Sequence, residues 1–204
     1  MKKKIAILGS TGSIGKSTLD IIRKDKKSFE IVFLSANNNY AKLVQQAKEF
    51  KVKNIFIKNK IFYERVKKSL KNSKTKVYSG DISITNIVSK KIDYTMAAIV
   101  GVAGLQPTID AIKISKTVAL ANKESIICGW EILSKLVKRY KTKIAPVDSE
   151  HFSIMELTKD IRDDEVEEII ITASGGPFLN TSQGKLKNIK PKQAINHPNW
   201  KMGK

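Results

Sequence analysis

The sequence is poor in cysteine, in arginine and in long apolar runs. The one cysteine, Cys128, cannot close an intrachain disulfide and lacks partners for a structural zinc site. It fits a reducing compartment, and we expect it to be a small buried hydrophobe. No apolar run reaches the roughly 20 residues of a membrane-spanning helix, and the start of the chain argues against a signal peptide. We therefore predict a soluble, cytoplasmic protein with no membrane partner.

The formal charge of +19 raises the question of nucleic-acid binding. Arginine, whose planar fork suits phosphate and base readout, is scarce, and lysines supply nearly all of the positive charge. The arginines are Arg23, Arg65, Arg139 and Arg162. Because the lysines are spread over every segment, we interpret them as a compositional bias of the kind an AT-rich genome imposes, and we predict no nucleic-acid partner. Tight DNA binding at physiological salt would support the opposite interpretation.

The first 150 residues alternate short β-branched runs with longer amphipathic stretches, which is typical of a parallel sheet covered by helices. The predicted strands are 4–8, 30–35, 54–57, 94–100, 117–120 and 143–147. The predicted helices are 16–24, 40–50, 61–71, 105–114 and 123–140. The pattern predicts an α/β fold, a doubly wound Rossmann-like parallel sheet, as a nucleotide-binding domain over residues 1–147.

From residue 148 onward the pattern changes. A helix-like stretch from Phe152, an acidic cluster at 163–165 and an apolar strand at 168–173 precede a tail rich in glycine, proline and asparagine. We predict that residues 148–204 begin an α+β catalytic domain. Because about 50 residues with one strand are hard to stabilise alone, we expect this domain to be incomplete and the chain to be truncated.

The strongest local motif is the glycine-rich turn from Gly9 to Gly15, Gly-Ser-Thr-Gly-Ser-Ile-Gly, between a predicted strand and a predicted helix. Glycine permits the tight turn, lets backbone amides approach a pyrophosphate and packs the helix on the strand. The spacing departs from G-x-G-x-x-G and suits loops in which Thr11 and Ser13 add hydroxyl contacts to phosphate. The turn predicts a dinucleotide site, and a purely structural turn is the alternative.

The end of the second predicted strand bears on the choice of cofactor. An acidic residue there would bind the ribose 2′-hydroxyl of NAD, whereas this chain has Asn37, Asn38 and Asn39. No carboxylate repels a 2′-phosphate, so NADP is allowed. The expected basic residue is also absent, and a nearby lysine such as Lys42 would have to replace it.

Two polar clusters follow later predicted strands. Asn122, Lys123 and Glu124 lie at a strand's carboxyl end, where open α/β sheets bind ligands, and a solvated Lys-Glu pair is the alternative. In Asp148-Ser-Glu150, an extended backbone would point both carboxylates to one side, as Mg²⁺ or Mn²⁺ would require. Exposed acidic residues without function are the alternative there. We interpret His151 as a neighbour of this pair, not as a ligand.

The tail holds two further candidate segments. The turn Ser174-Gly-Gly-Pro follows the apolar strand and offers free amides and a hydroxyl to an oxyanion. The segment from His197 to Gly203 combines histidine, tryptophan and methionine, a composition suited to a lid that excludes water.

In this order the motifs GSTGSIG, AAIVG, LANKES, PVDSEH, SGGPF and HPNW closely resemble the 1-deoxy-D-xylulose 5-phosphate reductoisomerase family. The resemblance runs along the whole chain and covers about half of such an enzyme. It implies a metal-assisted rearrangement of 1-deoxy-D-xylulose 5-phosphate, followed by hydride transfer from NADPH. The product would be 2-C-methyl-D-erythritol 4-phosphate, a precursor of non-mevalonate isoprenoid synthesis, and the full-length enzyme would be a homodimer.

The resemblance also assigns roles to residues. The residues at positions of cofactor contacts are Thr11, Gly12, Ser13, Ile14, Asn37, Asn38, Asn39, Asn122, Glu124 and Gly203. Those matching substrate contacts are Lys123, Ser149, Glu150, Ser174, His197 and Trp200, of which Lys123, Glu150 and His197 are the implied catalytic residues. Asp148 and Glu150 match metal ligands for Mg²⁺ or Mn²⁺.

The sequence departs from the family in two ways. The family commonly has glycine and a basic residue where this chain has Asn37 and Asn38, and its third carboxylate ligand lies downstream of residue 204. We therefore expect the 204-residue chain alone to bind nucleotide weakly and not to turn over. A non-catalytic nucleotide-binding remnant is one alternative. A semialdehyde-type dehydrogenase is another, but it needs a nucleophilic cysteine, and nothing beside Cys128 would activate its thiol.

Overall fold

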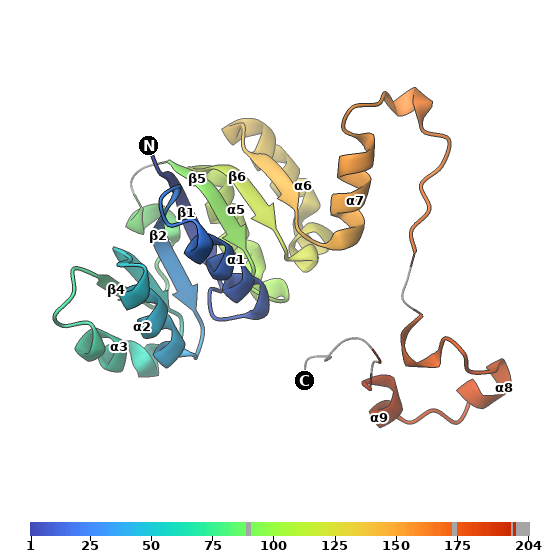
Figure 1. Ribbon diagram of the computed structural model, residues 1–204, viewed down its shortest axis with the longest axis horizontal. Helices are drawn as coiled ribbons and strands as arrows, with labels where there is room; N and C mark the ends of the chain where they lie inside the picture. The colour runs from blue at the N-terminus through green and yellow to red at the C-terminus, as the bar shows by residue number, and fades with distance from the viewer. Residues whose placement is uncertain (89–90, 173–174, 197, 199–204) are drawn as a thin grey trace. The chain divides into compact units, whose positions relative to one another are not determined.

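The computed structural model describes residues 1–88, 91–172, 175–196 and 198, and the chain divides into two compact units (Figure 1). Unit 1 is Met1–Phe152 and unit 2 is Ser153–Lys204. The two compact units divide after Phe152, within a helix. The domain boundary expected after residue 147 stays a prediction.

In the described part of unit 1, seven strands form one parallel sheet in the order β4-β3-β2-β1-β5-β6-β7. The strands are β1 (Lys3–Leu8), β2 (Phe29–Ala36), β3 (Asn54–Ile57), β4 (Lys76–Ser79), β5 (Ile92–Ala97), β6 (Ser115–Leu120) and β7 (Lys143–Pro146). Strands β2, β3 and β4 extend the sheet from β1 to one edge, and β5, β6 and β7 extend it from β1 to the other edge. This doubly wound arrangement confirms the predicted fold class.

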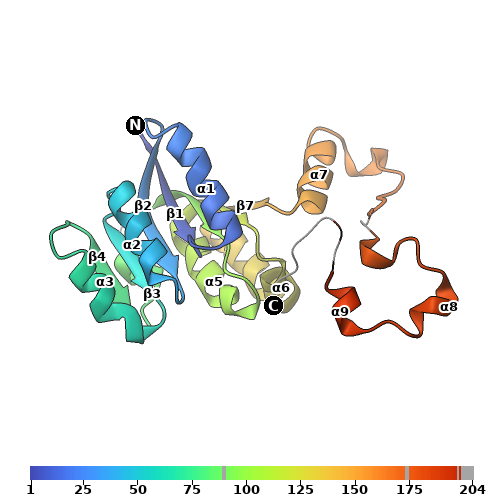
Figure 2. The same cartoon turned by 60° about the horizontal axis from the view of Figure 1, so that its bottom comes forward.

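Helices cover both faces of the sheet, and the strands run beneath α1 and α2 in Figure 2. They are α1 (Ser13–Lys24), α2 (Tyr40–Glu49), α3 (Tyr63–Ser69), α4 (Ile84–Ile87), α5 (Leu105–Ile114) and α6 (Lys123–Tyr140), with 3-10 turns η1 (Lys60–Phe62) and η2 (Val102–Gly104). Helices α1, α2 and α3 pack into one apolar cluster, and α4, α5 and α6 into a second on the opposite face.

The alternation of side chains along β1 explains the two clusters. Ile5 and Ile7 join the cluster under α1 and α2, while Ala6 and Leu8 join the cluster under α5 and α6. A parallel strand with both faces covered must be apolar on both sides, which is why β1 and β2 are nearly continuous apolar runs.

The predicted strands at 4–8, 30–35, 54–57, 117–120 and 143–147 are all present, with small shifts at their ends, and the helices at 105–114 and 123–140 have the predicted bounds. The predicted strand 94–100 instead ends at Ala97, and Val100 is 84% exposed. Strand β4 was not predicted, because it is a short, partly exposed edge strand with little apolar pattern.

Cys128 is exposed, so the prediction of a buried thiol is wrong. Helix α6 buries Ser125, Gly129 and Leu133, which are spaced four residues apart on one face. Cys128 lies one residue before Gly129 and is therefore turned well away from the buried face.

Unit 2 has short elements and little burial. The end of α7 (Ser149–Thr158) is followed by η3 (Asp163–Glu165), η4 (Gly176–Phe178), α8 (Gln183–Leu186) and α9 (Pro191–Ala194). Among its described residues none is buried. The predicted strand 168–173 is wrong over 168–172, where Ile169, Ile170 and Ile171 are 57%, 74% and 72% exposed, because no neighbouring strand pairs with this run among the described residues.

Within the described ranges, no helix combines the length and the apolar content needed to cross a membrane.

Candidate functional site

The glycine-rich turn joins β1 to α1 and is built around glycine. Gly9 has φ 82°, a conformation that side chains disfavour, and a Cβ there would lie 2.7 Å from the Ala98 carbonyl oxygen. A Cβ on Gly15 would lie 2.4 Å from the Gly9 carbonyl oxygen. Gly12, by contrast, is exposed, and its Cβ would meet only the Gly9 carbonyl oxygen at 3.4 Å. Gly9 and Gly15 therefore shape the turn, while the Gly12 side stays open to a ligand.

The amino end of α1 faces the same open side. No side chain among the described residues caps this helix, whose first turn holds the exposed Ser13 and Ile14. Free amides at a helix amino terminus attract anions through their partial positive charge. With half-buried Thr11 beside them, these residues fit the predicted pyrophosphate site.

A buried polar network holds this turn in place. It was not predicted from the sequence. The Ser10 hydroxyl donates to Gln46 Oε1 at 2.8 Å, and Gln46 Nε2 donates back to the Ser10 carbonyl at 2.9 Å. The Gly9 amide donates to Ser35 Oγ at 3.1 Å. Ser10 and Gln46 are almost fully buried. The signal available in the sequence was Gln46 itself, a polar residue on the apolar face of α2 beside Leu43 and Ala47.

Two of the three asparagines after β2 use their side chains in hydrogen bonds within the protein. Asn39 caps α2, because its Oδ1 accepts from the Lys42 amide at 3.1 Å. Asn38 Oδ1 accepts from Asn59 Nδ2 at 2.9 Å, which ties this loop to the loop after β3. The Lys42 ammonium, proposed from sequence as a replacement cation, donates to Gln45 on its own helix at 3.0 Å.

Asn122 connects the loops after β5 and β6. Its Nδ2 donates to the carbonyls of Ile99 and, at 2.8 Å, Gly101, and its Oδ1 accepts from the Ser125 amide at 2.6 Å, capping α6. Asn122 is 2% exposed, so its main role in this structure is to hold the two loops together. The next residue, Lys123, is exposed.

Asp148 and Glu150 lie at the carboxyl end of β7, but not as predicted. The strand ends at Pro146 and α7 begins at Ser149, so the extended backbone that would align their side chains is absent at these described positions. Asp148 instead caps the first turn of α7, where its carboxylate accepts from the His151 amide at 3.0 Å and contacts His151 Nδ1 at 2.7 Å. Glu150 is exposed and accepts from Ser149 Oγ at 3.0 Å.

The electrostatics of Asp148 link the β6 and β7 ends. Burial by itself raises the pKa of this carboxyl. Hydrogen bonds from His151 and the charges of His151 and Lys123 outweigh that effect, so the pKa lies below its ordinary value. Lys123 is therefore near enough to act on Asp148, and the Val147 amide donates to the Leu120 carbonyl at 3.1 Å between the same two strand ends.

The donor set at Asp148 and Glu150 suits a hard divalent cation in type but not in number. Carboxylate oxygens are the ligands that Mg²⁺ prefers. Over the described ranges, however, no group of three or more histidine, cysteine, aspartate or glutamate side chains converges on one point. These two residues can supply only part of a coordination sphere.

Four of the predicted site residues, Ser174, His197, Trp200 and Gly203, lie outside the described residues.

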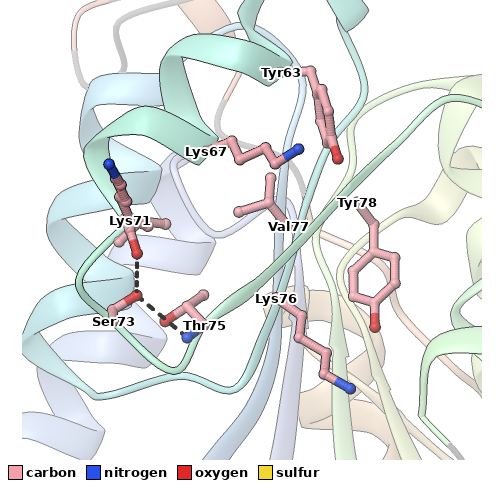
Figure 3. Close-up of a pocket in the computed structure, with 9 residues that line it drawn as sticks. Tyr63, Lys67, Lys71, Ser73, Thr75, Lys76, Val77 and Tyr78 are labelled. Carbon is pink, nitrogen blue, oxygen red and sulfur yellow. Dashed lines mark hydrogen bonds between the residues drawn. The ribbon is translucent and has the colours of Figure 1, made fainter.

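A surface hollow of about 500 Å³ lies elsewhere, between α3 and β4 (Figure 3). Its lining includes Tyr63, Lys67, Lys71 and Tyr78, none of which is a predicted site residue. This hollow belongs to the sheet edge and not to the strand ends that carry the motifs.

Comparison with known proteins agrees with the motifs. The sequence model described as 1-deoxy-D-xylulose 5-phosphate reductoisomerase matches residues 5–129, and that of the C-terminal domain of the same enzyme matches residues 144–204. The chain belongs to the 1-deoxy-D-xylulose 5-phosphate reductoisomerase family.

Individual reductoisomerases match along nearly the whole chain. The enzyme of Pelagibacter ubique is 53% identical over 204 residues, which are 99% of this chain and 53% of that protein. The solved reductoisomerase of Zymomonas mobilis in complex with NADPH is 38% identical with a TM-score of 0.91, over 97% of this chain and 52% of that one. A reductoisomerase solved with NADPH, fosmidomycin and magnesium is 36% identical with a TM-score of 0.85, over 98% and 52%. The chain spans about half the length of the curated relatives it matches.

Proposed function

We propose that this chain supplies the cofactor-binding part and two metal ligands of an enzyme that converts 1-deoxy-D-xylulose 5-phosphate to 2-C-methyl-D-erythritol 4-phosphate. The reaction would depend on NADPH and on Mg²⁺ or Mn²⁺. Family membership supports the activity, and the solved relatives with bound NADPH and magnesium support the cofactors.

One structural observation carries the proposal: the loops with the family motifs form a continuous row at the carboxyl edge of the sheet. Gly9 packs against the Ala98 carbonyl after β5, and Asn122 holds the loop that follows. The Val147 amide donates to the Leu120 carbonyl at 3.1 Å, which joins the ends of β6 and β7 directly before Asp148. Ligands of open α/β sheets bind along this edge. The row would place a nucleotide at one end and a metal and substrate at the other.

Each part of the row has a chemical role in this proposal. The amides at the start of α1 and the hydroxyls of Thr11 and Ser13 bind pyrophosphate, and NADPH, when bound, supplies the hydride. Lys123 contributes positive charge to the phosphorylated substrate. Asp148 and Glu150 would hold the divalent cation, whose charge would polarise the substrate oxygens. Because His151 contacts both Asp148 oxygens, at 2.7 and 2.8 Å, it competes with the cation for them.

A second candidate is a nucleotide-binding chain without catalytic activity of its own. The observation that favours it is that only two carboxylates are available, which is too few ligands to hold a metal ion firmly in the described residues. We propose accordingly that the 204-residue chain binds NADPH weakly and does not turn over. The same proposal includes substrate or cofactor contacts by Ser174, His197, Trp200 and Gly203, and a catalytic domain from residue 148. It also includes a homodimer in the cytoplasm with no nucleic-acid or membrane partner.

The test uses the purified 204-residue chain. NADPH binding is measured by the change in nicotinamide fluorescence, and turnover by NADPH absorbance after addition of Mg²⁺ and the ketose phosphate. We expect weak saturable binding, loss of binding in Gly12→Val, and a constant absorbance. Gly12→Val blocks the open side of the turn, while Gly184→Val, where a Cβ has open space, is the matched control.

Two outcomes would contradict the proposal in different ways. Absence of any saturable NADPH binding at millimolar concentration would remove the cofactor site. Metal-dependent NADPH oxidation by the chain would overturn the statement that it is inactive alone.

A further inference from the structure

The loop after β3 is bonded to the three-asparagine loop after β2. The Lys58 amide donates to the Ala36 carbonyl at 2.9 Å, and the Asn59 amide donates to the Asn37 carbonyl at 3.2 Å. The Asn59 side chain adds its bond to Asn38. These bonds hold residues 58 and 59 directly beside the end of β2, where the adenosine ribose of a dinucleotide lies in this fold.

A 2′-phosphate at this position needs positive charge that the three asparagines lack. Their amides can donate hydrogen bonds, but a charged donor binds phosphate about twice as strongly. Lys42 is turned along its own helix to Gln45. Lys60 lies along Gly80, with its Cε 3.1 Å from the position of a Cβ on that glycine. Lys58 is the lysine whose backbone is bonded to the end of β2.

The present partner of Lys58 can be exchanged at little cost. Its ammonium pairs with Asp81 Oδ1 at 3.0 Å, and the two side chains are 59% and 87% exposed. Ion pairs this exposed contribute little to stability. A phosphate dianion would attract the same ammonium more strongly than one carboxylate does.

We propose that Lys58 recognises the 2′-phosphate of the dinucleotide and replaces the basic residue that is absent from positions 37–39. This inference rests on the proposed NADPH-binding function and names the group that selects NADPH over NADH. Asp81 acts as a competitor that lowers the affinity for the phosphate.

The test measures binding of adenosine 2′,5′-bisphosphate and of adenosine 5′-monophosphate, which differ only in the 2′-phosphate, to the whole 204-residue chain by ligand-observed NMR. For Lys58→Ala we expect about tenfold weaker bisphosphate binding, the loss of one charge-assisted contact. Monophosphate binding should stay within about twofold of wild type, because the 5′-phosphate is held by the glycine-rich turn. Asp81→Asn should strengthen bisphosphate binding alone.

The matched control is Lys53→Ala. Lys53 also flanks β3 and also forms an exposed ion pair, with Glu30 at 3.6 Å, but it lies at the amino end of the strand. It removes the same charge from the protein without touching the carboxyl edge. Equal effects of Lys53→Ala and Lys58→Ala would show a general charge effect and overturn the assignment.

The remaining outcomes separate this inference from the proposed function. If the wild-type chain prefers the bisphosphate and Lys58→Ala keeps that preference, the role of Lys58 is refuted while the cofactor site stands. The same holds if the preference is lost in Lys42→Ala or Lys60→Ala instead. A wild-type chain that binds neither ligand would refute the cofactor site and the assignment with it.

Discussion

The two units use apolar residues in opposite ways. In unit 1 the isoleucines of β1 are buried between helices and neighbouring strands, with Ile7 at 0% exposure. In unit 2 an equally apolar run leaves Ile170 at 74% exposure. Both runs look like strands in the sequence. An apolar run therefore becomes a strand only when other segments satisfy its backbone hydrogen bonds and cover its faces.

The largest expected effect comes from truncating the same residue type in each unit. Ile7→Ala should lower the free energy of unfolding by about 2–5 kcal/mol, because it leaves a cavity between β1 and the helices. Ile170→Ala should leave it unchanged, since that side chain is largely exposed. Urea denaturation followed by circular dichroism measures both. A loss of stability in Ile170→Ala comparable to that of Ile7→Ala would mean that the 168–172 run is packed in solution.

A smaller effect is expected from adding one methyl group to a glycine in each unit. Gly15→Ala should cost about 1–3 kcal/mol, because the new Cβ would lie 2.4 Å from the Gly9 carbonyl oxygen and the turn must shift. Gly184→Ala in α8 should cost nothing, since a Cβ at this position has open space beyond the helix's own backbone and its chain neighbours. Thermal unfolding of the two variants compares them, and equal melting temperatures would show that the turn is looser than the structure indicates.

The smallest expected effect depends on pH. Asp93 in unit 1 accepts from the Lys4 amide at 2.9 Å and pairs with Lys116 at 2.7 Å, and the bond from Lys116 is the largest cause that lowers the pKa of this carboxyl. Its stabilisation is therefore present above its unfolded pKa of about 3.9 and is lost as the pH falls through the lower folded pKa. Asp93→Asn should be less stable than wild type at pH 7.

That difference should shrink as the pH falls below about 4. Asp164→Asn in unit 2 is the control, because Asp164 and its partner Arg162 are 73% and 74% exposed and such pairs contribute little. Urea denaturation at several pH values gives both curves. A stability difference between Asp93→Asn and wild type that stays constant down to pH 2 would contradict the assigned cause.

The candidate site could be predicted from sequence where the local backbone geometry accepts only one residue type. The turn from Gly9 to Gly15 could be found because tight backbone approaches leave glycine as the residue that fits. The network of Ser10, Ser35 and Gln46 could not, because its members are far apart in the chain and meet only when α2 packs on the sheet. Asp148 and Glu150 were singled out through an extended geometry that the helix start at Ser149 replaces.

The α/β class, most strands and helices of unit 1 and the residues of the glycine-rich turn could be predicted from local sequence, whereas the edge strand β4 and the short helix α4 could not. The predictable features depend on local periodicity and local steric demands, which neighbouring residues encode. Three features emerge from the packing alone: which apolar run is covered, that Cys128 is exposed, and which lysine stands beside the asparagines after β2. Burial and hydrogen bonding between distant segments depend on how strands pair, and no single stretch of sequence contains that information.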